Sequence, residues 1–512
     1  MLQSSAPALT TPHIITFMID DLDRASLDRL VAAGLVPNIR KHLIERGTDF
    51  RQSYSTDSIC CPSRATFFSG QYVHNHGVKT ITVGSRHIYP SDATGQGGEG
   101  TFLPTWLQAA GYETALFGKY LNGYGSEVKN GETRIPQGYN YWLALQGANT
   151  YKVFGYDYNE NGTMHAGGTD AASYQTDFIR DRAVAYINSI NPKTPQFVYI
   201  APTAPHTEVG EDRPGFATYG STFSWTVRPA PRHERYMDGD ESNGEVPAIN
   251  DQLPNYNESD ATYSSKPGWM KEGVPSMTIT QRAGAARQYK QRMAAMLAID
   301  EMVGAVVDAL AARGMLDNTL LLFTADNGYF LGEHRLAEKG APYEEGLRVP
   351  LVIRAPSSTT AANACPLLVG NHDLAATISD YANAKPTRKA DGRSLRSLIE
   401  GKGTSSRRNL LIEHYQEATH IQALDVVWPY GAIRTQSTPE NPQQSANEIY
   451  TLFERENVVN KTEYYDLNND PYQLNNRGTQ LSSTDAASLS RRLGALRTCA
   501  GSECKSAEDA PK

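Results

Sequence analysis

The chain has 512 residues, of which 39% are hydrophobic and 20% are charged, and its 48 Lys and Arg residues against 56 Asp and Glu residues give a net charge of −8. This hydrophobic fraction is too high for a disordered chain, and the acidic balance argues against a general nucleic-acid binder, which needs a basic surface. No apolar run approaches the ~20 residues of a membrane span, so a globular protein with one large and one smaller domain is expected.

Five cysteines are too few for a small disulfide-built protein, but two of them carry information. Cys499 and Cys504 enclose four residues in a short loop that a disulfide could close, which would indicate an oxidising compartment; the alternative is two free thiols. Residues 1–13 show neither the basic nor the apolar region of an export signal. We expect a periplasmic or secreted protein whose signal is removed, with a cytosolic protein as the alternative.

Strand and helix patterns alternate along the first 354 residues. An apolar, β-branched run at 13–19 predicts a buried strand, and residues 24–46 predict helices broken near Gly34 and Pro37. There follow a helix at 104–110, a strand at 113–117, a helix at 171–190, a strand at 196–200, a helix at 281–313, and strands at 319–324 and 351–354. The alternation predicts an α/β fold with a mostly parallel central sheet sandwiched by helices.

Two regions depart from this alternation. Residues 203–280 are rich in Pro, Gly, Asp, Asn and Tyr and lack periodicity, so we expect loops near the active site; the alternative is a disordered insertion. Residues 401–408 are typical of a linker. Beyond them, residues 409–512 contain three short strand patterns and a helix pattern near 485–496, which predict a small α+β domain with an antiparallel sheet. The predicted domains are therefore 1–400 and 409–512.

Four predicted strands end in polar residues. These are Asp20 and Asp21, Lys119, His206, and Asp326 with Asn327. In mostly parallel sheets, ligands bind beyond the carboxyl ends of the strands, so the convergence predicts an active site there.

The segment around Cys60 predicts a helix start. Pro62 suits a first helical turn, which places Cys60 where free N–H groups and the helix dipole favour an anion, and Arg64 lies one turn further on. The physical chemistry of the segment alone fits either a nucleophilic cysteine or a buried, inert one.

The pattern from Cys60 to Gly70 resembles the signature of the type I sulfatases of the alkaline phosphatase superfamily, in which the first Cys is oxidised to Cα-formylglycine. The matching positions are Cys60, Pro62, Ser63, Arg64, Ser69 and Gly70. Other family features recur in order at 20–21, 117–119, 204–206, 325–328, 339–350 and 464–471. The resemblance implies that a formylglycine-generating enzyme modifies Cys60, and that the hydrated aldehyde then attacks a sulfate monoester and forms a covalent sulfate-enzyme intermediate.

Segments 60–64, 72–76, 118–124 and 326–329 are most similar to the N-acetylglucosamine-6-sulfatase and heparan sulfatase branch. This implies a sulfated carbohydrate as substrate, with aryl sulfates as model substrates. Two alternatives stay open. One is a phosphonate monoester hydrolase or phosphodiesterase on the same scaffold, and the other is a binding protein with an unmodified Cys60.

The resemblance also implies a metal site. Its ligands would be Asp20, Asp21, residue 60, Asp326 and Asn327. Oxygen ligands of this kind suit Ca²⁺, or Mg²⁺ if the cavity is small, whereas a zinc pair would need imidazoles. The three histidines nearby in motif positions, His74, His76 and His334, are expected to be structural or to support the ligands.

The remaining roles follow from the resemblance. Asp326 would accept the proton of the attacking hydroxyl, and His206 would protonate the leaving alcohol, or Lys339 would assist it. Lys119, Lys339 and Arg64 would supply positive charge, with Arg64 also holding the nucleophile.

The sequence departs from the family at one position. Many relatives carry His two residues after the motif lysine, where this chain has Leu121, so Asn122 or a residue of the 203–280 loops is expected to take over that duty. Four aromatic residues are candidates for sugar stacking, with ordinary packing as the alternative: Tyr124, Tyr141, Trp142 and Trp269.

Overall fold

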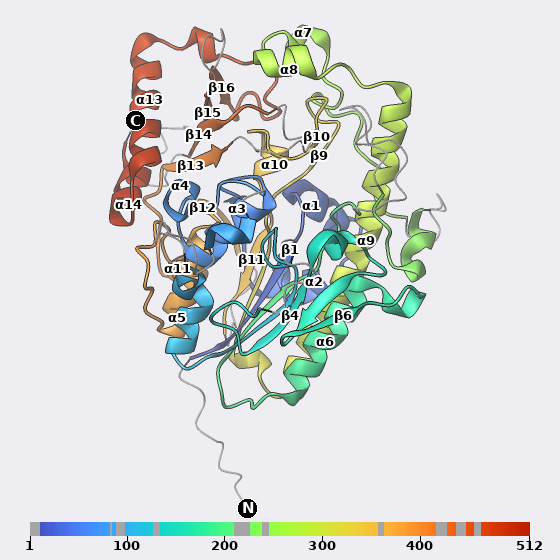
Figure 1. Cartoon of the computed structure of the whole chain (residues 1–512). Coiled ribbons are helices and arrows are strands. Elements are labelled where there is room, and N and C mark those ends of the chain that lie inside the picture. Colours follow the sequence, from blue (N-terminus) through green and yellow to red (C-terminus); the bar gives the residue numbers. More distant parts are fainter. Residues whose placement is uncertain are drawn as a thin grey trace, which may run out of the picture.

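The computed structural model describes residues 11–81, 84–88, 98–125, 134–208, 226–237, 245–356, 363–415, 427–436, 447–454 and 462–511. Its two main sheets are a large central one and a small C-terminal one (Figure 1). Within the described ranges, no helix is both long enough and apolar enough to cross a lipid bilayer.

The central sheet has ten strands. In spatial order they are β12 (Asn363–Gly370), β2 (Thr48–Tyr54), β11 (Leu351–Arg354), β8 (Thr319–Ala325), β1 (His13–Ile19), β7 (Gln196–Ala201), β3 (Glu113–Gly118), β4 (Tyr141–Leu145), β5 (Asp157–Glu160) and β6 (Thr163–Ala166). Neighbouring strands from β8 to β4 are parallel, whereas β11 and β5 run against their neighbours. The predicted mostly parallel sheet is confirmed.

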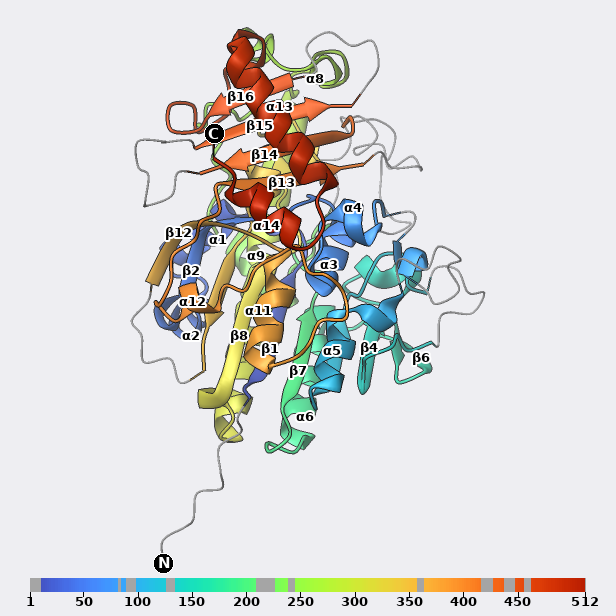
Figure 2. The same cartoon turned by 90° about the vertical axis from the view of Figure 1, so that its left-hand side faces the viewer.

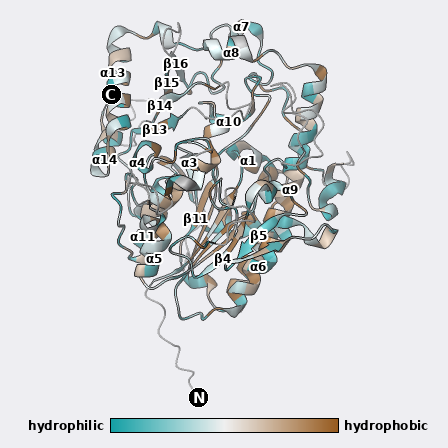
Figure 3. Ribbon diagram, viewed as in Figure 1, coloured by the Kyte–Doolittle hydropathy of each residue, from teal (hydrophilic) through white to brown (hydrophobic). Residues whose placement is uncertain are grey.

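Strand β1 shows why the middle of the sheet is mostly apolar. All seven of its residues are buried, and successive side chains point to opposite faces. Ile15, Phe17 and Ile19 join one hydrophobic cluster, whereas Ile14 and Met18 join another. Figure 3 shows the same concentration of hydrophobic residues in the central strands. A strand covered on both faces is mostly apolar instead of alternating between polar and apolar residues.

Helices cover both faces of the sheet. One cluster contains residues of α1 (Arg24–Ala32), α2 (Pro37–His42), α6 (Gln175–Ser189) and α9 (Ile279–Ala312). The other contains residues of α3 (Cys60–Ser69), α5 (Leu103–Ala109) and α11 (Asp373–Ala382), which lie in front of the strands in Figure 2. Thr278 and Gln281 form a reciprocal capping box at the start of α9, which fixes where this long helix begins.

The C-terminal sheet is antiparallel, as predicted. Its strands are β13 (Asn409–His414), β14 (Tyr430–Thr435), β15 (Glu448–Phe453) and β16 (Thr462–Asp466), and α13 (Ser483–Thr498) and α14 (Ser502–Asp509) follow them. Cys499 and Cys504 are joined by a disulfide between these two helices.

The segment 401–408 has no helix or strand, but it is not a free spacer. Arg407 within it is fully buried and pairs with Asp373 of α11 and Glu508 of α14. The irregular segment therefore helps to attach the C-terminal helices to the central fold.

Part of the region 203–280 also differs from the expectation of loops around the active site. Residues 209–225 and 238–244 lie outside the described residues. Short helices α7 (Asp260–Tyr263) and α8 (Gly268–Gly273) are present, and Trp269 and Met270 are buried in the cluster of the C-terminal sheet. Apolar side chains in this stretch thus anchor it to the smaller sheet.

Candidate active site

The polar residues predicted at four strand ends do converge. Strands β8, β1, β7 and β3 are consecutive neighbours, and all four run in the same direction. The residues that follow them are Asp326 and Asn327, Asp20 and Asp21, His206, and Lys119. These side chains therefore meet at one edge of the sheet.

Close backbone packing shapes this edge. A Cβ atom on Gly118 would lie 2.1 Å from the carbonyl oxygen of Ala201, so only glycine fits where β3 ends beside β7. Asp21 has a φ of 62°, which is rare for a residue other than glycine. The backbone N–H of Asp21 donates to Oδ1 of Asp326 at 3.0 Å, which stabilises this turn.

Buried oxygen atoms without a hydrogen-bond donor gather beside this turn. Among the described residues, Oδ1 of Asp20, Oδ2 of Asp21 and Oδ1 of Asn327 have no hydrogen-bond partner, although all three side chains are fully buried. Nδ2 of Asn327 donates to Oδ1 of Asp21 at 2.6 Å. The nitrogen of this amide therefore faces Asp21, and its oxygen points away from Asp21. Buried carboxylate oxygens without partners are costly unless a cation binds them. The donor set fits a hard divalent ion such as Ca²⁺.

Two buried lysines pair with the two aspartates. Lys119 Nζ lies 2.7 Å from Oδ2 of Asp20, and Lys339 makes a short contact with Oδ1 of Asp21. Burial alone would lower the pKa of each ammonium group, but the adjacent carboxylate outweighs burial and raises it. Both lysines therefore stay charged at neutral pH.

Arg64 braces the same carboxylates from helix α3. Its Nε donates to Oδ2 of Asp326 at 2.7 Å, and its Nη1 donates to the carbonyl oxygen of Lys119 at 3.0 Å. Nη2 lies 3.8 Å from Asp20. Its side chain contacts two aspartates and the backbone just after β3. Arg64 thus orders the acidic groups, and its expected role in holding the nucleophile stays a prediction.

Cys60 begins α3, as the position of Pro62 predicts, and is 1% exposed. Its Sγ donates to Oδ1 of Asn122 at 3.3 Å. Ser63, on the same helix, donates to the carbonyl oxygen of Asp326 and accepts from Nδ2 of Asn371 at 2.9 Å. Helix α3 is therefore tied directly to the strand end that carries Asp326.

His206 faces the aspartates from the segment after β7. Its Nδ1 lies 2.6 Å from the carbonyl oxygen of Thr207, and its Nε2 lies 3.5 Å from Oδ2 of Asp21. Because a carbonyl oxygen only accepts, Nδ1 carries a proton and Nε2 is directed into the site. Burial lowers the pKa of His206 more than Asp21 and Asp20 raise it.

Sequence reasoning missed two residues at this site. Arg292 of α9 is buried; it donates to the carbonyl oxygens of Pro205, at 2.9 Å, and of Asp21, so it holds the His206 segment to the aspartate turn. Tyr151 lies against His206, with ring centroids 4.2 Å apart. Arg292 could have been found as a charged residue within the apolar pattern of 281–313. No motif in the sequence indicates Tyr151.

The three additional histidines are structural, as expected. His74 contacts Glu413 and the carbonyl oxygen of Cys499, His76 contacts Thr66, and His334 contacts Glu258. Each of these contacts joins neighbouring elements of the fold.

The sugar-stacking candidates are mostly packing residues. Tyr124, Trp142 and Trp269 are buried, and Tyr141 packs against Phe117 and Tyr186. Their contacts fit the alternative, which is ordinary packing within the fold.

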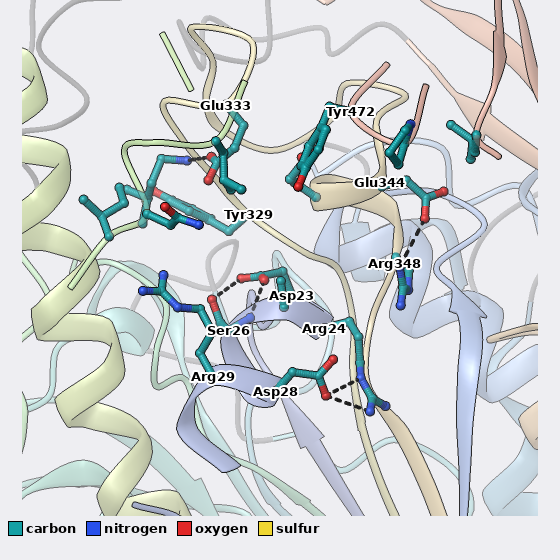
Figure 4. Close-up of a pocket in the computed structure, with 18 of the residues that line it drawn as sticks. Asp23, Arg24, Ser26, Asp28, Arg29, Tyr329, Glu333, Glu344, Arg348 and Tyr472 are labelled. Atoms are coloured by element: carbon teal, nitrogen blue, oxygen red, sulfur yellow. Dashed lines mark hydrogen bonds and ion pairs between the residues drawn. The ribbon is translucent and has the colours of Figure 1, made fainter. Parts of the chain in front are cut away.

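A separate cavity of about 470 Å³ lies between α1, α9 and the C-terminal sheet (Figure 4). In the described part of the chain, its lining does not include Cys60, Lys119, His206 or Lys339. Much of its charge is already paired, for example Arg24 with Asp28 and Glu344 with Arg348. The cavity is thus distinct from the strand-end site.

Comparisons with known proteins identify the family of this chain. The family model described as "Sulfatase" matches residues 12–384, and the one described as "N-sulphoglucosamine sulphohydrolase, C-terminal" matches residues 332–498. An arylsulfatase of Volvox carteri is 29% identical over 98% of this chain and 77% of its own length. The human N-acetylglucosamine-6-sulfatase is 27% identical over 96% of this chain and 86% of its own length.

Solved structures show the same fold. One, described as a complex with its substrate D-glucosamine-2-N,6-O-disulfate, has a TM-score of 0.71 and 23% identity, covering 98% of this chain and 100% of that one. Together, this structure and the two family models cover both the central sheet and the C-terminal domain of the chain. The chain belongs to the sulfatase family and is a sulfuric ester hydrolase.

Proposed function

We propose that this sulfatase hydrolyses sulfate monoesters of a saccharide, with residue 60 as the nucleophile after its maturation from cysteine to formylglycine. The observation that carries the proposal is the position of Cys60. It begins a buried helix beside three cations and a set of buried oxygens that lack donors. A helix start of this kind favours the negative charge that develops on sulfate during the reaction.

The charges of the site support a divalent ion. Three carboxylates (Asp20, Asp21, Asp326) and three cations (Arg64, Lys119, Lys339) balance one another. A bound Ca²⁺ would give the site a net positive charge, which an anionic sulfate ester needs. We propose that Asp20, Asp21, Asp326 and Asn327 hold this ion together with residue 60.

The cofactors would supply a nucleophilic hydroxyl from the hydrated aldehyde and Lewis acidity from the metal. Asp326, held by Arg64, is the proposed acceptor of the proton of that hydroxyl. Lys119 and Lys339 would bind sulfate oxygens. His206 would donate a proton from Nε2 to the leaving alcohol when both ring nitrogens are protonated, since its Nδ1 is engaged with Thr207. The overall reaction converts a sulfate ester and water into an alcohol and sulfate.

The names of relatives support a saccharide as the substrate. The human relative is named for N-acetylglucosamine 6-sulfate, and the solved structure holds a glucosamine disulfate. A formylglycine-generating enzyme is the proposed maturation partner. We also propose an oxidising compartment, supported by the Cys499–Cys504 disulfide and by a relative described as an extracellular sulfatase.

A substrate panel tests the proposal. The protein from a host that forms formylglycine would be assayed on defined sulfated glucosamines, an aryl sulfate, an aryl phosphonate and an aryl phosphodiester. We expect the highest kcat/KM on a sulfated sugar and no turnover by Cys60→Ala. A large preference for the phosphorus esters would instead identify a phosphonate or phosphodiester hydrolase. Activity retained in Cys60→Ala would overturn the assignment of residue 60 as the nucleophile. So would an unmodified Cys60, found by peptide mass spectrometry in fully active protein.

A further inference from the structure

Asn122 lies between residue 60 and Tyr151. Sγ of Cys60 donates to Oδ1 of Asn122 at 3.3 Å, and Nδ2 of Asn122 donates to the hydroxyl oxygen of Tyr151 at 2.9 Å. Asn122 follows β3 closely, whereas Tyr151 ends the short helix η4 (Gly147–Tyr151). Two segments on the β3–β4 side of the sheet thus form one hydrogen-bonded chain that reaches the proposed nucleophile.

The ring of Tyr151 touches two further groups of the proposed machinery. It stacks on the imidazole of His206, with centroids 4.2 Å apart and planes 22° apart. The ammonium nitrogen of Lys119 lies 4.8 Å from the ring centroid, a cation–π arrangement. One side chain therefore contacts Asn122 through its hydroxyl and His206 and Lys119 through its ring.

The direction of the Asn122 amide matters for the nucleophile. An amide has an acceptor at one end and a donor at the other, so a half-turn exchanges them. Donation from Nδ2 to Tyr151 leaves Oδ1 directed at residue 60. In the matured residue, the position of Sγ stands in for a hydroxyl oxygen of the hydrated aldehyde. That hydroxyl has one proton to donate, and the acceptor end of the amide can receive this hydrogen bond.

The contact between Asn122 and residue 60 also bears on Leu121, which stands where many relatives have a histidine. This residue, two positions after Lys119, is buried in an apolar cluster and offers no hydrogen bond to residue 60. The next residue, Asn122, makes the contact. An amide oxygen accepts a hydrogen bond but is a weak base, so it orients a hydroxyl without removing its proton.

We propose that Asn122 is a catalytic residue, whose Oδ1 accepts a hydrogen bond from a hydroxyl of matured residue 60, and that Tyr151 is the positioning residue for Asn122 and for the His206 ring. This inference rests on the proposed function, since it assigns a role beside the same nucleophile. It predicts two separable effects of Tyr151, one through the hydroxyl and one through the ring.

The hydroxyl is tested by a double-mutant cycle. Tyr151→Phe keeps the ring but frees the amide to turn, so kcat on an aryl sulfate should fall about tenfold with little change in KM, as expected for a lost hydrogen bond of about 1.4 kcal/mol. In the Asn122→Ala background, the same Tyr151→Phe change should alter kcat less than about twofold, because independent sites add and coupled ones do not. An equal effect in both backgrounds would overturn the coupling through Asn122.

The ring is tested by leaving-group dependence. Protonation of the leaving oxygen matters for a sugar alcohol but little for a nitrophenolate. Tyr151→Leu removes the stack on His206, so its loss of kcat should be greater on a sugar sulfate than on nitrophenyl sulfate. Tyr151→Phe should show the same loss on both substrates. Identical losses in Tyr151→Leu on both substrates would refute a role in positioning His206.

Controls separate this proposal from the proposed function and from folding. Tyr186→Phe removes a hydroxyl that donates to Gln196 at 3.0 Å, away from the site, and should leave kcat unchanged. Thermal denaturation checks that each variant folds. Failure of the native enzyme to cleave any sulfate ester would refute the proposed function. An active enzyme that is unaffected by Tyr151→Phe would refute this inference alone.

Discussion

Arg64 and Asp326 form an ion pair that is completely withdrawn from solvent, with Nε of Arg64 2.7 Å from Oδ2 of Asp326. The pair joins the helix that starts with the proposed nucleophile to a strand end that supplies a proposed metal ligand. A buried pair of this kind is destabilising to break, because the remaining partner is left as an uncompensated charge.

Arg64→Lys keeps the positive charge, but it is still expected to lower catalysis strongly. Lysine cannot donate to Asp326 and to the carbonyl oxygen of Lys119 in the same fork geometry. The resulting shift of Asp326 should lower kcat about 10²-fold, as small misplacements at active sites do. Steady-state kinetics on an aryl sulfate measure the loss. Arg40→Lys, at an exposed pair with Glu45, is the matched control and should leave kcat unchanged.

Metal removal should destabilise the protein as well as inactivate it. Without an ion, the buried oxygens of Asp20, Asp21 and Asn327 lose their proposed partner. Calorimetry after chelation should show a lower Tm that Ca²⁺ restores; binding at 1,000 times Kd contributes about 4 kcal/mol. Asp21→Asn should respond weakly to Ca²⁺, whereas Asp308→Asn, at an exposed position on α9, should respond like the native protein. An unchanged Tm in all three would contradict the site.

Acid should weaken the attachment of α14. Glu508 is buried and accepts from Tyr72 at 2.6 Å and from Arg407 at 2.9 Å. Burial alone would raise its pKa, but Arg407 and His372 outweigh burial and lower the pKa from 4.5 to about 2. Because the folded-state pKa is depressed, ionised Glu508 contributes stability above about pH 4.5, and this contribution is lost as the pH falls toward 2.

Glu508→Gln should therefore lower the free energy of unfolding at pH 7 by about 3–5 kcal/mol, the usual cost of breaking a buried pair. The difference from the native protein should shrink between pH 4.5 and pH 2, as followed by urea unfolding at each pH. Glu503→Gln, exposed on the same helix, is the control. A difference that is independent of pH would show that Glu508 acts by packing alone.

The Cys499–Cys504 disulfide should stabilise the fold modestly. It closes a short loop, with a sequence separation of 5, so the loop-entropy contribution is about 2 kcal/mol. The double variant Cys499→Ala, Cys504→Ala should lose about this much stability, keep its kcat, and no longer respond to dithiothreitol in thermal scans. A loss of kcat would link the disulfide to the active site through His74 and the Cys499 carbonyl.

The strand ends of the central sheet were predictable because burial on both faces leaves a clear apolar run, as in β1 and β8. Strand β2 was not, since its sequence contains Arg51 and Gln52 and its partners β11 and β12 lie about 300 residues further along the chain. Long-range pairing supplies what its local pattern does not indicate.

The same distinction applies to the site. Motif residues such as Asp20, Lys119 and Asp326 follow strands and could be placed from the sequence. Tyr151 comes from a polar stretch with no periodicity, and only tertiary contact brings it to His206. The aromatic residues with a strong sequence signal, such as Trp142, are buried in the core instead.

The contact between Tyr72 and Glu508 joins residues 436 positions apart. At a synthesis rate of ~5–20 residues per second, α3 and the segment after it leave the ribosome on the order of 20–90 s before the carboxylate that seals them is made. The strands that flank β2 also arrive late in this interval. For the proposed maturation of Cys60, translation would therefore set the time before the C-terminal helices dock.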